Sequence, residues 1–196
     1  MVILTKKERE ALLILFKDFS SYYNANSLSK KLSISHVGAQ KLLKRFKKEG
    51  LTITKRVGKS IIHKLKIDDD YKQKLISFLL VDEANNFKRW KDEFKELFKK
   101  GRVVLMYGSA IKNYKTASDI DIMVVIKKDE ADGVDKIVDK IGKILPKEIH
   151  SIKLTEKDLL KNIKEENEAI VDIIRNAIIL YGYDKYVEAI KNVTGF

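Results

Sequence analysis

The chain has no cysteine, a single proline and no long apolar run. The absence of cysteine from its 196 residues excludes a disulfide framework and a cysteine-based zinc site. No apolar run approaches the roughly 20 residues that a membrane-spanning helix needs, and the N-terminal residues lack a signal-peptide cleavage site. We therefore expect a cytoplasmic protein of one large or two small domains, whose cores are built from the 44% hydrophobic residues.

The net charge of +12 is confined to the first third of the chain. Residues 1–67 hold 16 Lys and Arg against 4 Asp and Glu, whereas residues 68–196 hold 24 of each. Such an asymmetry favours two domains with different partners, and a small basic module is typical of nucleic-acid binding. The alternative is a lysine-rich surface that is only solvated and needs no partner.

Three helix patterns open the basic region. Thr5 and Glu8 form a capping-box pair at the start of the first helix, and Asn26 or Ser27 is expected to cap a short second helix. The third helix is predicted over residues 36–49, and its apolar positions are Val37, Leu42, Leu43 and Phe46. Its polar face carries Gln40, Lys41, Lys44, Arg45, Lys47 and Lys48.

Two strand patterns follow the third helix. Residues 51–56 and 60–67 alternate apolar and polar side chains around a glycine turn, which predicts a hairpin. Three helices and a basic hairpin look like a winged helix-turn-helix, whose third helix enters the major groove of duplex DNA. The expected DNA contacts are Gln40, Lys41, Lys44 and Arg45 on the helix, and Lys55, Arg56 and Lys59 on the hairpin. Winged helices also serve as protein-contact modules, so a protein partner is the alternative.

A helical linker is predicted between two domains. The three aspartates at residues 68–70 can cap a helix, and helical periodicity continues over residues 71–100 as one long helix or two. The aromatic stripe along this segment is expected in the core. We therefore place the domains at residues 1–67 and 101–196, with residues 68–100 between them.

The most distinctive stretch reads VVLMYGSAIKNYKTASDIDIMVVI and spans residues 103–126. It holds two short apolar runs, residues 103–107 and 122–126, that are typical of buried strands. Gly108 permits a tight turn after the first run. Ser109 is expected to begin a helix whose N–H groups can hold a phosphate.

Two aspartates precede the second apolar run. Side chains at i and i+2 of a strand share a face, so Asp119 and Asp121 should point the same way while Ile120 enters the core. Paired carboxylates in an apolar strand repel each other and lose solvation, and a divalent cation such as Mg²⁺ offsets both effects. The alternative is a metal-free strand pair whose aspartates cap the neighbouring turn.

The order of strand, Gly-Ser turn, Asp-x-Asp and strand resembles the signature of the DNA polymerase β-type nucleotidyltransferase superfamily, above all its small archaeal and bacterial members. The resemblance covers roughly residues 80–196. It implies an α+β chain in which the winged helix domain is joined to a nucleotidyltransferase-like domain with a small mixed sheet flanked by helices. It also implies that Gly108 and Ser109 contact the phosphates of an NTP, that Asp119 and Asp121 bind Mg²⁺ or Mn²⁺, and that Lys112 or Lys115 loosely matches a basic residue of the family.

The family usually has a third carboxylate on the next strand, and this chain departs from that pattern. Residues 148–154 alternate and predict that strand, where His150 occupies the expected position and Glu148 lies two residues earlier on the same face. Three alternatives stay open. His150 acts as the general base, a shift of register recruits Glu148, or the third group is absent and the domain binds nucleotide with little or no catalysis.

Helices are expected to flank the sheet. They are predicted over residues 134–145, after a cap at Thr155, and over residues 163–181 and 183–193. The apolar positions of the later helices should pack on the back of the sheet.

Two functions remain. One is an enzyme that moves a nucleoside monophosphate from an NTP to a hydroxyl. The other is a DNA-binding transcriptional regulator whose nucleotidyltransferase-like domain is catalytically degenerate and senses nucleotide or contacts a protein. The resemblance adds a third possible function, that of an antitoxin that modifies a partner toxin. The sequence leaves the acceptor, the base preference, the operator and the oligomeric state open, a homodimer included.

Overall fold

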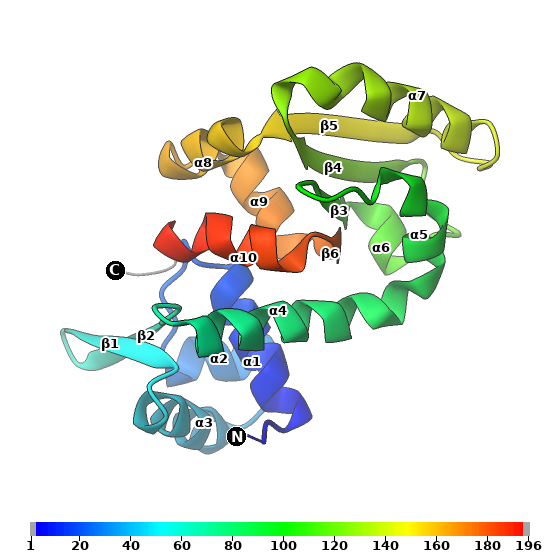
Figure 1. Cartoon of the computed structure of the whole chain (residues 1–196). Coiled ribbons are helices and arrows are strands. Elements are labelled where there is room, and N and C mark those ends of the chain that lie inside the picture. Colours follow the sequence, from blue (N-terminus) through cyan, green and yellow to red (C-terminus); the bar gives the residue numbers. More distant parts are fainter. Residues whose placement is uncertain (1–2, 194–196) are drawn as a thin grey trace. The chain divides into compact units, whose positions relative to one another are not determined.

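The computed structural model describes residues 3–193, which fall into two compact units (Figure 1). One unit comprises residues 3–79 and 190–193, and the other is Leu80–Ala189. Within residues 3–193, none of the helices combines the length and the apolar character that crossing a membrane requires. The basic residues of the N-terminal third and the Asp-x-Asp stretch therefore lie in different units.

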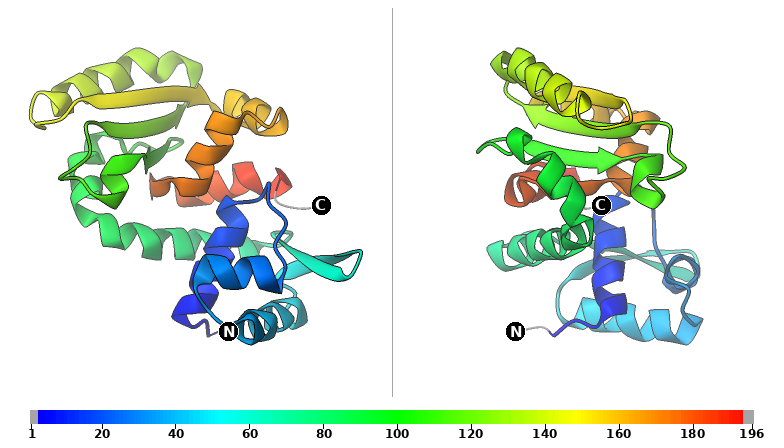
Figure 2. Two further views of the ribbon diagram at one scale, coloured as in Figure 1. Left: turned by 180° about the vertical axis from the view of Figure 1, so that it is seen from behind. Right: turned by 90° about the vertical axis from the view of Figure 1, so that its right-hand side faces the viewer.

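Three helices and an antiparallel hairpin open the first unit. They are α1 (Lys6–Lys17), α2 (Ala25–Leu32), α3 (His36–Lys48), β1 (Thr52–Val57) and β2 (Ser60–Leu65). The hairpin extends beyond the helices (Figure 2). Phe16, Leu28 and Phe46 are fully buried between the helices, so one apolar core holds α1, α2 and α3 together.

Side-chain hydrogen bonds determine where these helices begin. Thr5 and Glu8 form the predicted capping box of α1, and Ser35 accepts a hydrogen bond from the backbone N–H of Gly38 at the start of α3. The predicted cap of α2 is wrong, because Asn24 is the N-cap in place of Asn26 or Ser27. Asn24 and Ser27 satisfy each other's backbone N–H groups, which fixes the helix start.

The apolar positions of α3 are not all buried. Val37, in the first turn of the helix, is 57% exposed. The buried face of α3 consists of Ala39, Leu42, Leu43 and Phe46. Val37 therefore belongs to the same exposed surface as the polar side chains of α3.

Helix α4 (Asp70–Ala84) contains the boundary between the units. The Lys72 backbone N–H donates to Asp69 Oδ1 at 2.8 Å, as the aspartate run predicts. The helical segment then breaks into short pieces, η1 (Asn85–Phe87), α5 (Lys88–Glu93) and η2 (Lys95–Leu97). The prediction of one or two long helices is therefore wrong for the second half of this segment.

A four-stranded mixed sheet forms the centre of the second unit. Its strands are β3 (Val103–Tyr107), β4 (Ile120–Ile126), β5 (Ile149–Thr155) and β6 (Ile178–Tyr181), in the order β5-β4-β3-β6. Strand β4 pairs parallel with β5, whereas β3 pairs antiparallel with both β4 and β6. The predicted α+β architecture, a small mixed sheet flanked by helices, is confirmed.

The remaining helices of the second unit flank this sheet. They are α6 (Ser109–Lys112), η3 (Lys128–Glu130), α7 (Ala131–Gly142), α8 (Glu156–Lys164), α9 (Glu168–Asn176) and α10 (Tyr183–Ile190). The short η4 (Lys191–Val193) follows α10 and belongs to the first unit. Figures 1 and 2 both show α7 lying along the sheet. Its buried residues Val134, Val138 and Ile141 share a core with Val104, Met106, Ile122 and Val124 of the strands. Full burial of each such side chain stabilises the fold by about 1.5–3 kcal/mol.

The predicted helix over residues 163–181 is wrong, because this segment ends in strand β6. Glu166 has a left-handed backbone with φ of 53°, and Asn167 caps a new helix by accepting from the Ile170 N–H. Ala177 is extended, and the chain then pairs with β3. A short apolar run such as residues 178–180 has no periodicity that separates a strand from a helix.

Buried Arg102 joins the start of β3 to η3. Arg102 is 5% exposed, and its Nη2 lies 3.1 Å from Oε1 of Glu130. The Lys99 ammonium lies 3.0 Å from the same oxygen. Three neighbouring donors lower the pKa of Glu130 to about 2. The Lys99 ammonium has the largest effect, followed by the Lys127 backbone N–H and the Arg102 guanidinium.

We expect Glu130→Gln to lower the free energy of unfolding at pH 7 by about 1–3 kcal/mol, because a buried guanidinium loses its charged partner. The folded-state pKa of Glu130 is depressed, so this stabilisation is present above the ordinary value of 4.5 and is lost as the pH falls toward 2. Urea denaturation at pH 7 and pH 3 measures both effects. The matched control is Glu96→Gln, whose exposed pair with Lys140 should change stability by less than about 1 kcal/mol. Equal losses in the two variants would contradict the assignment.

Candidate functional site

Asp119 and Asp121 lie at the start of β4. Ile120, between them, is fully buried, and the two carboxylates lie on the opposite side of the strand. Asp119 Oδ2 lies 3.6 Å from Nδ1 of His150, and Asp121 Oδ1 lies 3.7 Å from the same nitrogen. The aspartates therefore face one point, as the alternation of a strand predicts.

Strand pairing brings His150 to this point. The parallel register of β4 and β5 places His150 opposite Asp121. Glu148 comes just before β5 and is 80% exposed, and its Oε1 lies 3.6 Å from His150 Nε2. The register thus places the imidazole, and not Glu148, beside the paired aspartates.

The three side chains fit a divalent metal ion. One ligand atom each of Asp119, Asp121 and His150 lies within 4.8 Å of the other two. Two carboxylate oxygens and an imidazole nitrogen are donors that divalent ions accept. The cluster lies at the surface, because His150 is half exposed and both aspartates are partly exposed, so a ligand can reach it.

Gly108 forms the turn that closes the site on the β3 side. Its φ is 79° and its ψ is −161°, a backbone conformation that is essentially restricted to glycine. A Cβ at this position would lie 2.1 Å from Asp121 Oδ2. Ser109 and Lys112 are exposed at the two ends of the short helix α6 that follows. The structure thus brings Gly108 against Asp121 and places Lys112 one helical turn away.

Sequence reasoning missed Tyr107. The antiparallel register of β3 and β4 pairs Tyr107 with Asp121, which puts both side chains on one face of the sheet. Burial raises the pKa of Tyr107 to about 12, with smaller contributions from Asp121 and Asp119. The phenol of Tyr107, which like any tyrosine keeps its proton at neutral pH, can donate a hydrogen bond to a ligand in the site. The signal in the sequence was its position directly before the Gly-Ser turn.

Burial and the charge of Asp119 raise the pKa of Asp121. The carboxylate pair is thus electrostatically unfavourable by itself, and the positive charge of a metal ion would relieve it.

The loop between α6 and β4 is held by an aromatic contact. Tyr114 packs edge-on against Trp90 with ring centroids 5.2 Å apart, and the Arg89 guanidinium lies 4.3 Å above the Tyr114 ring. The Lys147 ammonium lies 4.9 Å from the centroid of the same ring and donates to the carbonyl of Ala117. These contacts fix the segment that leads into Asp119, and none of them was predicted from the sequence.

Residues 87–181 match a family model described as a nucleotidyltransferase domain. The match supports membership of this segment in the nucleotidyltransferase superfamily. It includes every site residue from Tyr107 to His150 and suggests transfer activity that uses an NTP, in a family that generally employs a divalent metal. No curated protein and no solved structure matches the chain.

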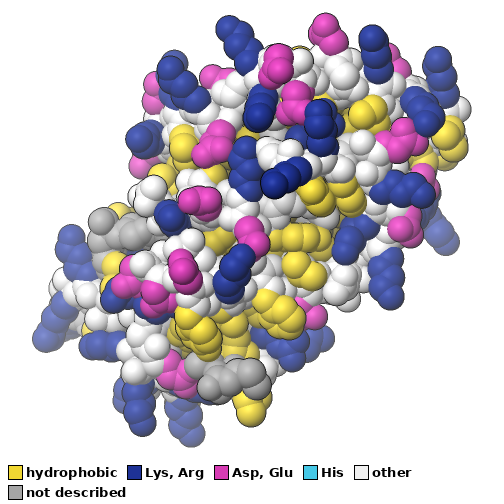
Figure 3. All heavy atoms as spheres, in the orientation of Figure 1, with side chains coloured by type: hydrophobic (Ala, Val, Ile, Leu, Met, Phe, Trp, Pro, Cys, Tyr) yellow, Lys and Arg dark blue, Asp and Glu magenta, His cyan; other side chains and the backbone are white. Residues whose placement is uncertain are grey.

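The predicted DNA-contacting side chains lie outside the nucleotidyltransferase match, on the first unit. Those of α3, namely Gln40, Lys41 and Lys44, are exposed, as are Lys55, Arg56 and Lys59 of the hairpin. Arg56 Nε donates to the carbonyl of Gly58 in the turn. Figure 3 shows basic side chains projecting around α3 and the hairpin.

Arg45 differs from the other predicted DNA contacts. Its Nη1 lies 2.7 Å from Oε1 of Glu8 in α1, and its Nε lies 2.8 Å from Oε1 of Glu49. Its Nη2 donates to the carbonyl of Ile3. The guanidinium thus links α3 to α1, and a contact of Arg45 with DNA stays a prediction.

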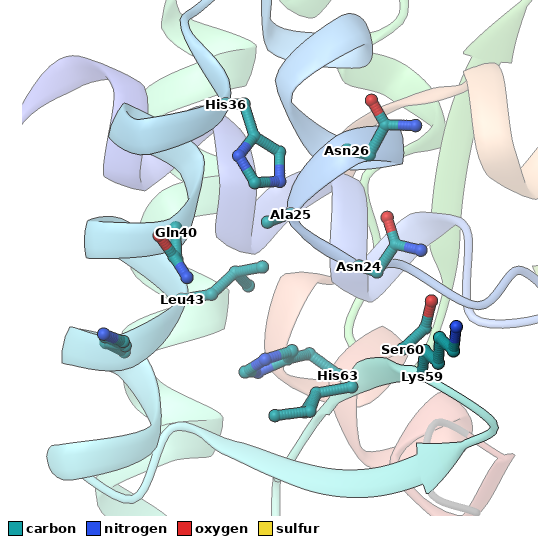
Figure 4. Close-up of a pocket in the computed structure, with 11 residues that line it drawn as sticks. Asn24, Ala25, Asn26, His36, Gln40, Leu43, Lys59, Ser60 and His63 are labelled. Carbon is teal, nitrogen blue, oxygen red and sulfur yellow. The ribbon is translucent and has the colours of Figure 1, made fainter.

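A polar pocket of about 300 Å³ lies between the start of α2, α3 and the hairpin. Figure 4 shows its labelled polar side chains around one hollow: Asn24, Asn26, His36, Gln40, Lys59, Ser60 and His63. None of the described residues that line it is acidic. His36 is exposed and His63 is buried. Two of the predicted DNA-contacting lysines, Lys44 and Lys59, thus line the pocket from its two sides, α3 and the hairpin.

Proposed function

We propose that the chain is a metal-dependent nucleotidyltransferase that moves a nucleoside monophosphate from an NTP to a hydroxyl acceptor. The observation that carries this proposal is the convergence of Asp119, Asp121 and His150 beside the Gly108 turn, inside the segment that matches the nucleotidyltransferase family. The acceptor hydroxyl oxygen forms a bond to the α-phosphorus and its proton passes to solvent water. The bond between the α-phosphorus and the oxygen that bridges to the β-phosphate breaks, and pyrophosphate leaves with that electron pair.

The proposed roles follow from the positions of the residues. Gly108 and Ser109 hold the nucleotide phosphates at the turn after β3. The hydroxyl group of Tyr107, the last residue of β3, donates a hydrogen bond to the bound nucleotide. Asp119 and Asp121 hold Mg²⁺ or Mn²⁺, which when bound neutralises phosphate charge and orients the in-line displacement. Lys112 lies at the end of α6, where its charge attracts the triphosphate.

Label transfer tests this proposal. The chain is incubated with α-labelled NTPs and Mg²⁺ or Mn²⁺, and nucleic acid, small hydroxyl compounds and cell lysate are offered as acceptors. We expect transfer that requires the metal and is slow on generic acceptors, because a missing general base lowers a rate by about 10²–10⁴-fold. If nucleotide binds through Asp119 and Asp121 but no acceptor is labelled, the regulator alternative replaces the enzyme.

The first unit supports a second activity, binding of duplex DNA by a winged helix. The observations that favour it are the +12 charge confined to residues 1–67 and the polar pocket without acidic lining between α3 and the hairpin. We propose that Gln40, Lys41 and Lys44 approach the major groove, and that Lys55, Arg56 and Lys59 contact phosphates.

Simultaneous replacement of Lys55, Arg56 and Lys59 by alanine should weaken DNA binding for all sequences alike. Each phosphate contact contributes about 0.9 to the slope of log K against log salt, so the slope should fall by up to about 2.7. Fluorescence anisotropy of a labelled duplex at several salt concentrations measures it. The control is the alanine triple at Lys157, Lys161 and Lys164 of α8, exposed lysines in the other unit. If both triple variants lose DNA affinity equally, or if the wild-type chain does not bind DNA at low salt, DNA binding by this unit is contradicted. The alternative of a protein partner would then replace it.

A further inference from the structure

His150 has a carboxylate near each of its ring nitrogens. Nδ1 faces Asp119 and Asp121 at 3.6 and 3.7 Å, and Nε2 faces Glu148 at 3.6 Å. The two Nδ1 separations exceed the roughly 2.7–3.2 Å of a hydrogen bond, whereas the largely exposed Glu148 side chain can close the few tenths of an ångström that separate it from hydrogen-bond distance of Nε2. Bonds of about 2.0–2.1 Å to one metal ion place two of its ligand atoms about 3–4 Å apart. The spacing around Nδ1 therefore suits shared ligation better than direct hydrogen bonding.

The position of Glu148 supports the same role for the ring. A histidine that binds a metal through one nitrogen commonly donates its other N–H to a carboxylate, which fixes the tautomer and the orientation of the ring. Glu148 lies on the Nε2 side, so the Nε2–H tautomer leaves the Nδ1 lone pair directed to Asp119 and Asp121. The backbone register fixes this arrangement, because β5 places His150 opposite Asp121.

We propose that His150 is a direct ligand of the divalent metal through Nδ1, and that it shifts the site's preference from Mg²⁺ toward transition-metal ions such as Mn²⁺ and Co²⁺. This inference rests on the proposed function, because it concerns the metal that Asp119 and Asp121 hold with the nucleotide. Mg²⁺ strongly prefers oxygen ligands, whereas affinity for a nitrogen-containing site rises along the first-row ions. An imidazole at the position of a family carboxylate thus changes which ion binds best.

The proposal gives Glu148 and His150 separate roles. A ligating Nδ1 has no lone pair left to accept the proton of the attacking hydroxyl, so His150 is a metal ligand and not the general base. Glu148 is a positioning residue that orients the ring. Because Glu148 is largely exposed, its replacement should lower metal affinity by about tenfold, the lower end of the range for such partners.

The first test detects the nitrogen directly. The full chain is loaded with Mn²⁺ and a non-hydrolysable ATP analogue, and electron spin-echo envelope modulation reports whether a nitrogen is bound to the ion. The chain has only three histidines, so the source can be assigned. We expect a directly bound nitrogen in the wild-type chain and in the control His36→Ala, and its loss in His150→Ala and His150→Asp.

The second test measures the preference among ions. Calorimetry gives the dissociation constants of Mg²⁺ and Co²⁺ in the presence of the same ATP analogue, for the wild-type chain and for His150→Asp. The aspartate restores the carboxylate that is usual in the family. We expect the ratio of the Mg²⁺ to the Co²⁺ dissociation constant to fall by at least about tenfold in His150→Asp, because the nitrogen ligand is replaced by oxygen.

The outcomes separate this inference from the proposed function. Metal that binds together with nucleotide, but without nitrogen coupling and with the same ion ratio in His150→Asp, overturns the ligand role and leaves the proposed function standing. Absence of metal binding in the presence of the ATP analogue overturns both. Nitrogen coupling that survives in His150→Ala would place the metal elsewhere and also overturn the ligand role.

Discussion

Replacing Asp121 by asparagine should abolish the metal-dependent part of ATP binding and leave the thermal stability of the chain unchanged or raised. The loss in metal affinity should exceed about 100-fold, the upper limit for residues that only support a ligand. Stability should not fall, because burial and Asp119 raise the pKa of Asp121, so its charged form opposes folding at neutral pH. An asparagine of the same shape removes that charge.

Two measurements on one sample check this prediction. Calorimetric titration with ATP and Mn²⁺ measures binding, and a thermal melt without metal measures stability. The matched control is Asp139→Asn, an exposed aspartate on α7, which should change neither. A variant at Asp121 that binds metal and ATP normally would show that the aspartates only cap the neighbouring turn. A variant that unfolds would show that Asp121 has a structural role.

The second large effect is expected at Gly108. Alanine there would place a Cβ 2.1 Å from Asp121 Oδ2, at a φ of 79°. The backbone strain alone amounts to about 1–3 kcal/mol, and relief of the clash must move either the turn or the Asp121 carboxylate. Gly108→Ala should therefore lower the melting temperature and also remove metal-dependent ATP binding, although it deletes no ligand.

Gly133 provides the control for this substitution. It lies in α7, and a Cβ there would meet no atom within 4 Å. Gly133→Ala should stabilise the chain by about 0.5–1 kcal/mol, because alanine favours the helix over glycine. Nucleotide binding should not change. If Gly108→Ala binds metal and ATP as the wild-type chain does, the turn does not shape the site.

The parts of the site that follow from local pattern could be predicted from the sequence. The alternation of a strand places Asp119 and Asp121 on one side, and the glycine before Ser109 marks a tight turn. The position of His150 on the next strand also follows from counting along an alternating segment. These inferences need only the period of a strand and the chemistry of the side chains.

Contacts between distant parts of the chain could not be predicted in this way. Tyr107 reaches the site only because β3 and β4 pair antiparallel in one register. Arg45 pairs with Glu8, which is far away in the sequence, and no local pattern indicates this ion pair. The run over residues 178–180 is short and apolar and has no period, so its local pattern does not separate strand β6 from the helix predicted there. In each case the partner, and not the local sequence, decides the outcome.

The most direct test of the central claim is whether metal and nucleotide bind the wild-type chain together. Calorimetry with one non-hydrolysable ATP analogue compares its binding in the presence of a chelator with its binding in excess Mn²⁺, and Mn²⁺ binding with and without the same analogue. Because coupling between two ligands is reciprocal, each should raise the affinity for the other by the same factor, at least about tenfold. Nucleotide binding whose affinity is the same with and without the metal would contradict the assignment of Asp119 and Asp121 as the metal site of a nucleotidyltransferase. Absence of binding of either ligand would contradict it as well.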